Sequence, residues 1–467
     1  MLKGLTVLAD INPQIFRQYD IRGVAERDLQ DETIELLGKA FGAHIKNSGT
    51  KQVLIGRDNR LSSNRLRDAI TRGLLSVGCD VVDIGMVVTP VLYYARIHYG
   101  IDGGVMITGS HNPPEDNGFK LALGDGTIYG EEIQKLKEMM IAGIFPSGPG
   151  SLEERDVLTH YLAMLKEKIV LGPRRLKVVV DCGNGTASLV AVQVLENWGC
   201  EVIPLYCESD GSFPNHQPDP VKTANLTELR RTVTETGANL GIALDGDADR
   251  IGVVDETGAI IWGDMLMCLY WREIMAAHPG AQAIIEVKCS QALVDEVVRL
   301  GGKPFFYKTG HSLIKAKMKE IGAVFTGEMS GHIFFADEYY GYDDAFYAAG
   351  RLLRLLSNTN EPLSKMLAGI PKYYSTAETR VPCPDQDKFR VVKDLVDQFK
   401  RQYEVIDVDG LRVLFGDGWG LVRASNTQPV LVARCEAKTP AGLERICGIM
   451  MGALEQYSEV GKFNWEY

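Results

Sequence analysis

Three aspartates occupy alternate positions in one short polar segment, Asp245-Gly246-Asp247-Ala248-Asp249, called here the aspartate loop. In an extended loop, this spacing of two directs all three carboxylates to one side. Three such anions repel one another unless a cation lies among them. Mg²⁺ is the preferred ion, because it is commonly held by few carboxylates together with a phosphate oxygen. The spacing therefore predicts a magnesium site formed by Asp245, Asp247 and Asp249.

Two other interpretations of the aspartate loop stay open at this point. A calcium-binding loop would have Glu256 at its twelfth position, but Arg250 stands sixth, where that loop requires glycine. The residues on either side also have the pattern of strands rather than helices. A solvated acidic turn that binds no metal would have the same composition.

A serine in a second loop is a candidate phosphoryl carrier. Ser110 belongs to Thr108-Gly109-Ser110-His111-Asn112-Pro113, the serine loop, and the prolines at 113 and 114 supply no backbone N–H to continue a sheet. A serine hydroxyl beside a bound cation can accept a phosphoryl group and return it. An ordinary turn or capping serine would have the same neighbours, so Ser110 alone does not decide the chemistry.

The net charge of −11 means that an anionic substrate must be bound by a local group of cations. The same acidic balance disfavours nucleic acids and anionic membranes as partners. Basic and imidazole side chains stand beside the predicted loops and strand ends, and these are Arg22, Lys120, Arg250, Lys288, Lys308, His311, His332 and Arg423. Each is unremarkable alone, so the prediction is that they converge on a phosphosugar.

A third and a fourth loop add polar groups to this set. Gly327-Glu328-Met329-Ser330-Gly331-His332, the glutamate loop, follows an apolar run. Arg423-Ala424-Ser425-Asn426-Thr427, the arginine loop, offers a guanidinium, two hydroxyls and an amide, which suit phosphate oxygens. A polar β-turn is the simpler interpretation of the arginine loop taken alone.

The elements that position these loops recur three times along the chain. An apolar run, an amphipathic helix that ends at glycine and a second apolar run begin near Val53, Val178 and Ile284. Such units form mostly parallel sheets with helices on their faces. Each unit is followed by a run that ends at the serine, aspartate or glutamate loop. Ligands bind beyond the carboxyl ends of such strands, so these loops are expected to converge between domains.

The pattern changes after Pro371 to a helical stretch at 388–403 and extended runs, which predicts a separate α+β domain. A length of 467 residues also favours roughly three to four domains. The expected fold class is α/β with four domains: three related mixed α/β domains with mostly parallel sheets, followed by the C-terminal α+β domain. Their expected bounds are 1–156, 157–258, 259–370 and 371–467.

The composition, 45% hydrophobic and 24% charged, is typical of a globular protein in water. No apolar run approaches the ~20 residues of a membrane span, and the start of the chain lacks a signal-type pattern, so a cytoplasmic location is expected. Nine cysteines without a C-x-x-C spacing indicate reduced thiols rather than a disulfide framework or zinc site. A bridge such as Cys200 to Cys207 is the minor alternative.

Taken together and in this order, the four loops resemble the signature loops of the α-D-phosphohexomutase family across essentially the whole chain. This resemblance implies four domains around a central cleft and reversible phosphoryl transfer between the 1- and 6-hydroxyls of a hexose phosphate. The transfer would proceed through phosphoserine and a 1,6-bisphosphate. Phosphate would be carried by Ser110, and Mg²⁺ would be held by Asp245, Asp247, Asp249 and the Ser110 phosphate. Hexose 1,6-bisphosphate would serve as activator.

The resemblance also implies roles for single residues. Glu328 and Ser330 would hold sugar hydroxyls. The phosphate remote from the reacting hydroxyl would be held by Arg423, Ser425, Asn426 and Thr427. General acid or base positions match Lys120 and His332, with Arg22 nearby. Ligand contacts match Tyr19, Arg250, Lys288, His311 and His332. Small hexose phosphates are the expected partners, and no obligate protein partner is inferred.

Substrate preference depends on one residue of the glutamate loop. Met329 between Glu328 and Ser330 resembles the bacterial phosphomannomutase/phosphoglucomutase branch, which implies mannose or glucose phosphate. Phosphoglucosamine mutases typically carry glutamine there and are the runner-up branch. A non-catalytic sugar-phosphate sensor and a phosphatase are alternatives of other classes, although the intact Ser110 and aspartates argue against the sensor.

Overall fold

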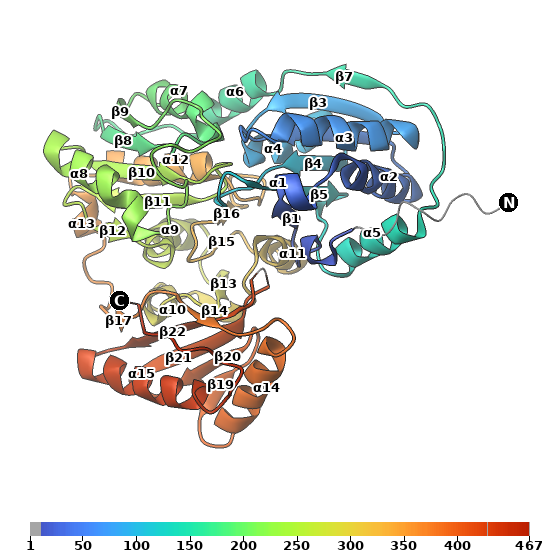
Figure 1. Ribbon diagram of the computed structural model, residues 1–467. Coiled ribbons are helices and arrows are strands. Elements are labelled where there is room, and N and C mark those ends of the chain that lie inside the picture. The colour runs from blue at the N-terminus through green and yellow to red at the C-terminus, as the bar shows by residue number, and fades with distance from the viewer. Residues whose placement is uncertain (1–10, 427, 467) are drawn as a thin grey trace. The chain divides into compact units, whose positions relative to one another are not determined.

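A computed structural model describes residues 11–426 and 428–466 of the chain (Figure 1). Thr427, one of the predicted phosphate contacts, lies outside the described residues. Two compact units are present. The first comprises the described residues up to Gly263 together with Ser330–Met366, and the second comprises Asp264–Met329 together with the described residues from Leu367 onward. The segment expected as the third domain, 259–370, therefore contributes to both units.

Seven strands form the first sheet of the first unit: β1 (Ile21–Val24), β2 (Gln52–Arg57), β3 (Asp80–Met86), β4 (Gly103–Ile107), β5 (Asp116–Leu123), β6 (Gly126–Thr127) and β7 (Leu152–Glu154). Their order is β1-β5-β4-β2-β3-β7, with β6 paired to β5. The pairs β2–β3, β2–β4 and β3–β7 are parallel, as the recurring unit predicts. β5 is antiparallel to β4 and β1, so the serine loop joins two strands of a hairpin.

The helices of this region are η1 (Pro13–Ile15), α1 (Ala25–Asp28), α2 (Asp31–Asn47), α3 (Ser63–Ser76), α4 (Thr89–Tyr99), α5 (Glu131–Ala142) and α6 (Leu158–Lys168). α3 buries Leu66, Ala69, Ile70 and Leu74, a helical spacing that places one apolar stripe against the core. α4 has a proline in its first turn and ends at Gly100, whose φ of 63° suits a glycine C-cap.

The second sheet of the first unit holds β8 (Lys177–Asp181), β9 (Glu201–Leu205), β10 (Leu240–Leu244), β11 (Ile251–Asp255) and β12 (Ile260–Ile261). Their order is β12-β11-β10-β8-β9. β8 is parallel to β9 and β10, whereas β10 and β11 form an antiparallel hairpin closed by the aspartate loop. This unit also contains η2 (Thr186–Leu189), α7 (Ala191–Asn197), η3 (Thr223–Leu226), α8 (Thr227–Thr236), β16 (Ile333–Phe335), α12 (Ala345–Ser357) and α13 (Leu363–Met366).

The second unit begins with a smaller α/β part. It contains α9 (Gly263–Ala277), β13 (Gln282–Glu286), α10 (Gln291–Arg299), β14 (Lys303–Tyr307), α11 (His311–Ile321) and β15 (Phe325–Gly327). β13 and β14 are parallel, and the Thr326 hydroxyl of β15 donates to the Ile284 carbonyl of β13 at 2.8 Å. The recurring unit near Ile284 is therefore a βαβ unit, as predicted.

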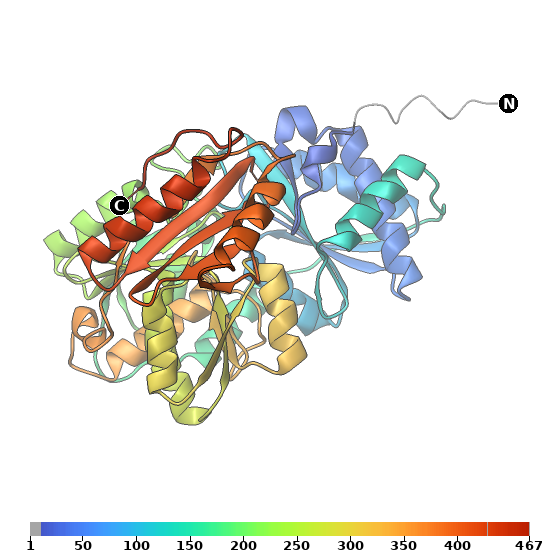
Figure 2. The ribbon, with the colours of Figure 1, turned by 90° about the horizontal axis from the view of Figure 1, so that it is seen from below.

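The C-terminal part of the second unit has one antiparallel sheet. Its strands are β17 (Tyr374–Ser375), β18 (Thr379–Pro382), β19 (Glu404–Ile406), β20 (Leu411–Leu414), β21 (Gly418–Ala424) and β22 (Val430–Ala437). Two helices, α14 (Lys388–Phe399) and α15 (Pro440–Leu454), lie on one face of this sheet (Figure 2). Val391 and Leu395 of α14 share a buried apolar cluster with Ile446 of α15 and Leu411 of β20. This arrangement confirms the predicted α+β domain.

In the described ranges, 11–426 and 428–466, no helix combines the length and apolar character needed to cross a membrane.

Candidate active site

The serine loop is held in an unusual conformation by a buried arginine. Ser110 has a φ of 48°, in the left-handed region that non-glycine residues rarely occupy, and is 2% exposed. The Arg60 guanidinium donates to the carbonyl oxygens of Ser110 at 2.8 Å and Asn112 at 2.6 Å. A Cβ at position 109 would lie 2.4 Å from this guanidinium, so the loop needs glycine there. Arg60 was not identified from the sequence, where nothing distinguishes it from a surface arginine.

The aspartate loop is a tight turn, and the expected extended conformation is wrong. Ala248 has a φ of 56°, and the Asp245 Oδ1 atom accepts the backbone N–H groups of Asp249 and Arg250, each at 3.1 Å. The three carboxylates nevertheless converge, because the turn wraps them around one point: they lie within 4.8 Å of one another and are fully buried. The convergence predicted from the spacing is present, but a different backbone geometry causes it.

The serine and aspartate loops pack directly against each other. The Ser110 hydroxyl donates to Asp245 Oδ2 at 2.7 Å. A Cβ at Gly246 would lie 2.3 Å from the Ser110 carbonyl oxygen, so only glycine permits this approach. His111 Nδ1 lies 3.2 Å from the Ser110 hydroxyl on another side. The predicted carrier hydroxyl thus lies beside the predicted metal ligands.

Lys120 of β5 is the cation that faces the aspartate loop. Its Nζ atom donates to Asp247 Oδ2 at 2.8 Å and also to Asp249 Oδ2. Burial alone would lower the pKa of Lys120, but the negative charges of Asp247 and Asp249 raise it well above its usual value. Lys120 is therefore held as an ammonium ion, a positive charge that can stabilise negative charge beside the aspartate loop.

The remaining carboxylate atoms suit a divalent cation. Burial and the neighbouring charges of Asp249 and Asp247 raise the pKa of Asp245, a sign of uncompensated negative charge. Oδ1 of Asp247 and Oδ1 of Asp249 are buried and accept no hydrogen bond within the described part of the chain. Buried carboxylate oxygens without donors are costly unless a cation lies nearby. The aspartate loop, with the adjacent Ser110 oxygen, therefore has the donor set of a hard metal ion.

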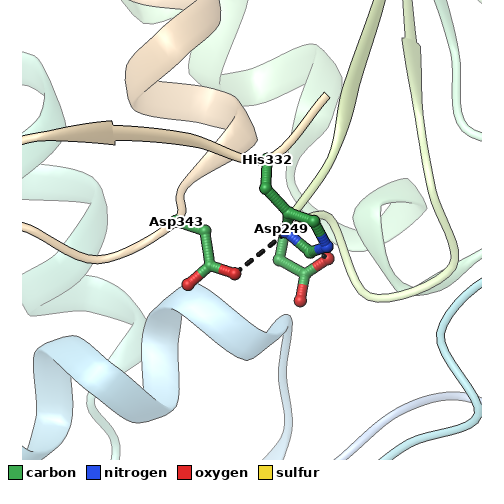
Figure 3. Close-up of side chains that lie close together, drawn as sticks. All are labelled: Asp249, His332 and Asp343. Atoms are coloured by element: carbon green, nitrogen blue, oxygen red, sulfur yellow. Dashed lines mark ion pairs between the residues drawn. The ribbon is translucent and has the colours of Figure 1, made fainter. Parts of the chain in front are cut away.

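His332 lies beside the carboxylates of Asp249 and Asp343 (Figure 3), and a guanidinium contacts its other ring nitrogen. Its Nε2 atom accepts from Arg250 Nε at 2.9 Å, while Nδ1 lies 2.9 Å from Asp343 Oδ2 and 3.5 Å from Asp249 Oδ1. A guanidinium can only donate, so Nε2 is the acceptor in the contact with Arg250, whereas Nδ1 lies within ion-pair distance of the Asp343 carboxylate. Asp343 was not identified from the sequence.

The other predicted residues of the first unit lie close to these loops in sequence or space. Arg22 of β1 donates to Asn112 Oδ1 at 2.9 Å and pairs with Asp20 at 2.7 Å, so it is attached to the serine loop. Tyr19 is half-buried in the turn before β1, and Ser330 is half-buried at the start of the segment that returns to this unit.

The second unit holds another set of predicted residues. Lys288 follows β13 and pairs with Glu378 at 2.8 Å. Burial would raise the pKa of Glu378, but the charge of Lys288 outweighs it and lowers the value to about 2. Glu328 Oε1 accepts the Gly310 N–H at 2.7 Å, which ties the glutamate loop to the segment before His311, the buried first residue of α11.

The arginine loop is anchored by two residues that sequence reasoning missed. Asp409 Oδ2 accepts from Arg423 Nε at 2.9 Å and from the Thr309 backbone N–H at 3.1 Å. Lys388, 4% exposed, donates to the carbonyl oxygens of Ser425 and Gln428 and so holds the turn. Asn426 is half-buried in the same turn. Lys308, one of the cations noted in the sequence, is exposed.

Four family models match the chain in order. They are Phosphoglucomutase/phosphomannomutase, alpha/beta/alpha domain I at residues 13–145, domain II at 159–258, domain III at 262–374, and the C-terminal domain at 378–453.

Curated relatives and a solved structure agree with these matches. A phosphomannomutase/phosphoglucomutase of Pseudomonas aeruginosa is 46% identical over 442 residues, which cover 94% of this chain and 95% of the relative. A phosphoglucomutase of Neisseria gonorrhoeae is 42% identical over 444 residues, covering 94% and 96%. The crystal structure of a phosphoglucomutase/phosphomannomutase family protein from Burkholderia thailandensis superposes with a TM-score of 0.91 at 41% identity, covering 98% of this chain and all of that one.

Proposed function

The chain belongs to the phosphoglucomutase/phosphomannomutase family, and from this premise we propose how its residues divide the work of a hexose phosphate mutase. The enzyme is an isomerase that transfers a phosphoryl group within a hexose phosphate. The proposed route is reversible transfer between the 1- and 6-hydroxyls through phosphoserine and a 1,6-bisphosphate, with hexose 1,6-bisphosphate as activator. We also propose four domains with bounds at 1–156, 157–258, 259–370 and 371–467.

The observation that carries this route is the hydrogen bond between Ser110 and Asp245 inside a buried cluster of like charges. A serine hydroxyl placed there can hold a phosphoryl group next to a cation and release it to a substrate hydroxyl. We assign Ser110 as the carrier. The metal ligands would be Asp245, Asp247, Asp249 and an oxygen on Ser110, and Mg²⁺ is the proposed ion. When bound, it offsets charge on the transferring phosphoryl group.

Lys120 and His332 are the proposed general acid or base residues, and their local environments differ. Lys120 is held as an ammonium by Asp247 and Asp249, so it suits charge stabilisation, and its proton would become easier to donate once a cation takes up these two carboxylates. His332 accepts from Arg250 through Nε2 and lies beside Asp343, so it would act as a base only when Arg250 turns away from Nε2 toward an anion such as substrate phosphate. Arg22, bound to the serine loop, is the proposed third cation at the transferring group.

The second unit is proposed to bind the sugar and the phosphate that does not react. Glu328 would accept hydrogen bonds from sugar hydroxyls, and Ser330 is also proposed to hold a sugar hydroxyl. The remote phosphate would be held by Arg423, Ser425, Asn426 and Thr427. Lys288 and His311, with Tyr19 and Arg250, are proposed as further ligand contacts. The salt bridges of Lys288 and Arg423 support this assignment, because they fix the positions of two cationic side chains at two loops of an acidic protein.

Mannose phosphate and glucose phosphate are the proposed substrates, and glucosamine phosphate is the alternative. The names of the relatives from Pseudomonas and Neisseria support this choice. Mannose and glucose differ only at C2, and uniform contacts to their shared hydroxyls give little discrimination. An amino group at C2 would add positive charge to a ligand whose proposed contacts are already cationic, which disfavours it. The cytoplasm is the proposed compartment, in keeping with nine thiols that are all unlinked.

Steady-state kcat/KM for the 1-phosphates of mannose, glucose and glucosamine, each with a catalytic amount of its bisphosphate, tests the proposal. We expect comparable values for the first two and a clearly lower value for the third. A tenfold advantage for glucosamine phosphate, about 1.4 kcal/mol of transition-state stabilisation, would place the chain in the other branch. Binding without turnover of any of the three would favour a sensor, and stoichiometric release of inorganic phosphate would favour a phosphatase.

A further inference from the structure

Two cysteines that the proposed reaction does not use lie side by side at the ends of parallel strands. Cys182 directly follows β8 and Cys207 lies two residues after β9, whose last residues, Asp181 and Leu205, are register partners. The Sγ atoms are 3.3 Å apart, within hydrogen-bonding distance for sulfur. This pairing differs from the Cys200 to Cys207 bridge that the sequence left as a minor alternative.

The two thiols are chemically unequal. Cys182 is fully buried, whereas Cys207 is half-buried. The hydrogen bond between them lowers the pKa of Cys207, while the same bond and burial raise the pKa of Cys182. Cys207, the less buried of the two, is therefore the thiol expected to meet an oxidant first, and Cys182 lies behind it as a second thiol within reach.

We propose that Cys182 and Cys207 form a reversible disulfide when a peroxide oxidises the enzyme, and that this bond slows the mutase. The Cys207 thiolate attacks one peroxide oxygen, the O–O bond breaks, and the leaving hydroxide takes up a proton to become water. The sulfur of Cys182 then attacks the Cys207 sulfenic acid. Its S–O bond breaks, the Cys182 proton leaves with the hydroxide as a second water, and the S–S bond remains. Two thiols and hydrogen peroxide thus give one disulfide and two waters.

Formation of this bond requires the chain to move. A disulfide has a sulfur separation of about 2.05 Å, so the two atoms must approach by roughly 1.2 Å from their present 3.3 Å. The segments that carry them are sharply turned, with a φ of 49° at Gly183 and 59° at Asn184 after the first cysteine, and 50° at Tyr206 before the second. Cys182 is fully buried among close-packed neighbours, so its side chain has little room to rotate and we expect part of the approach to come from the backbone.

The turn at 182–186 packs against the aspartate loop. The Thr186 N–H donates to the Gly246 carbonyl oxygen at 2.9 Å, and a Cβ at Gly185 would lie 3.0 Å from the Gly246 Cα. Gly246 separates two of the proposed metal ligands, Asp245 and Asp247. A shift of the 182–186 turn therefore reaches Asp245 and Asp247 through one contact, that of the turn with Gly246.

The same turn also contacts the segment that holds the serine loop. Asn59 Nδ2 donates to the Asn184 carbonyl oxygen at 2.7 Å, and the Asn59 N–H donates to the Thr186 hydroxyl at 3.1 Å. Arg60, the next residue, binds the carbonyl oxygens of the serine loop. Because displacements near 1 Å can lower turnover strongly, we expect the disulfide to reduce kcat/KM about tenfold or more.

The test treats purified full-length enzyme with limiting hydrogen peroxide, blocks remaining thiols and identifies linked peptides without reduction. Trypsin leaves Cys182, Cys200 and Cys207 on one peptide, because no lysine or arginine occurs between Lys177 and Lys222. Added glutamyl endopeptidase separates the three, because Glu196, Glu201 and Glu208 fall between or after them. Activity is assayed on the same samples before and after dithiothreitol.

We expect a Cys182–Cys207 link that forms as kcat/KM falls, with both reversed by dithiothreitol. A Cys207→Ser variant should show no link and keep its activity under the same peroxide dose, while Cys200→Ser should behave as wild type. The buried, hydrogen-bonded pair Cys435 and Cys447 is an internal control that should stay unlinked. Absence of the Cys182–Cys207 link in the wild type, or full linkage with unchanged kcat/KM, overturns the proposal even if a variant does not fold.

Discussion

The Ser110 hydroxyl donates a hydrogen bond of 2.7 Å to Oδ2 of Asp245, a residue 135 positions later in the chain. This bond joins the hairpin of β4 and β5 to the hairpin of β10 and β11 and places a nucleophilic oxygen beside three buried carboxylates. An isolated serine hydroxyl is a weak nucleophile, and an isolated group of buried carboxylates is unstable. The proposed phosphoryl transfer therefore depends on both features and on a bound cation.

Ser110→Ala and Ser110→Gly should both lower kcat by about three orders of magnitude or more, because both remove the carrier hydroxyl. They should differ in stability, since glycine adopts a φ of 48° without strain and alanine does not. The glycine variant is expected to be the more stable of the two, by about 1 kcal/mol. Hexose phosphate binding by calorimetry should persist in both, and phosphate mapping should place phosphoserine at 110 in wild type. Substantial turnover by either variant would exclude the covalent carrier.

Magnesium should stabilise the wild-type protein as well as activate it, because it relieves repulsion among Asp245, Asp247 and Asp249. Thermal unfolding with EDTA and with Mg²⁺ measures this effect. Asp247→Asn should reduce the Mg²⁺-dependent rise in unfolding temperature and raise the Mg²⁺ concentration needed for activity. Asp210→Asn, at an exposed turn of the same unit, is the matched control and should change neither. An enzyme that stays fully active after exhaustive chelation contradicts the metal assignment.

Lys120→Met should destabilise the metal-free protein by about 3 kcal/mol, because it leaves Asp247 and Asp249 buried without their cation. Adding Asp249→Asn to this variant should recover part of the stability but none of the activity. Denaturant unfolding in EDTA gives the first quantity and the coupled assay gives the second. If Lys120→Met unfolds at the same denaturant concentration as the wild type, the ion pairs of Lys120 with Asp247 and Asp249 do not stabilise the fold.

Asp344 should make stability depend on pH. Burial raises its pKa from 3.8 to about 6, against the hydrogen bonds donated by Tyr339 and Tyr161. Because the pKa of Asp344 is higher in the folded state, its protonated form contributes to the free energy of unfolding, and this contribution is fully present below about pH 4. It is lost as pH rises through 6, which lowers the free energy of unfolding by about 3 kcal/mol. Asp344→Asn cannot ionise, so its stability relative to wild type should increase by that amount between pH 4 and pH 7.

Unfolding of both proteins in denaturant at several pH values measures this difference. The amide side chain introduced by Asp344→Asn would still offer an oxygen to the Tyr347 N–H that Asp344 caps at the start of α12, so the helix end is preserved. Asp156→Asn, at an exposed position, should show no such gain with rising pH. A constant difference between Asp344→Asn and wild type across the range would show that Asp344 does not titrate there.

Features of this protein that depend on near neighbours in the chain follow from residue type and spacing. Alternating or continuous apolar runs predicted the strands around Val53, Val178 and Ile284, and the glycine-bearing polar loops after them indicated where chemistry occurs. The spacing of the three aspartates predicted that they converge. These features depend on neighbours within a few residues, so residue type and spacing were sufficient to predict them.

Contacts between residues that are distant in the sequence depend on the tertiary structure. Lys120 contacts Asp247 and Asp249 because β5 runs antiparallel to β4, a pairing that apolar patterns do not distinguish from a parallel one. The positions of Arg60 at the serine loop and of Cys182 beside Cys207 likewise depend on how strands and hairpins pack. Contacts across a hundred residues follow from sheet order and chain path. Sequence spacing alone cannot specify them, because many chain paths satisfy the same local pattern.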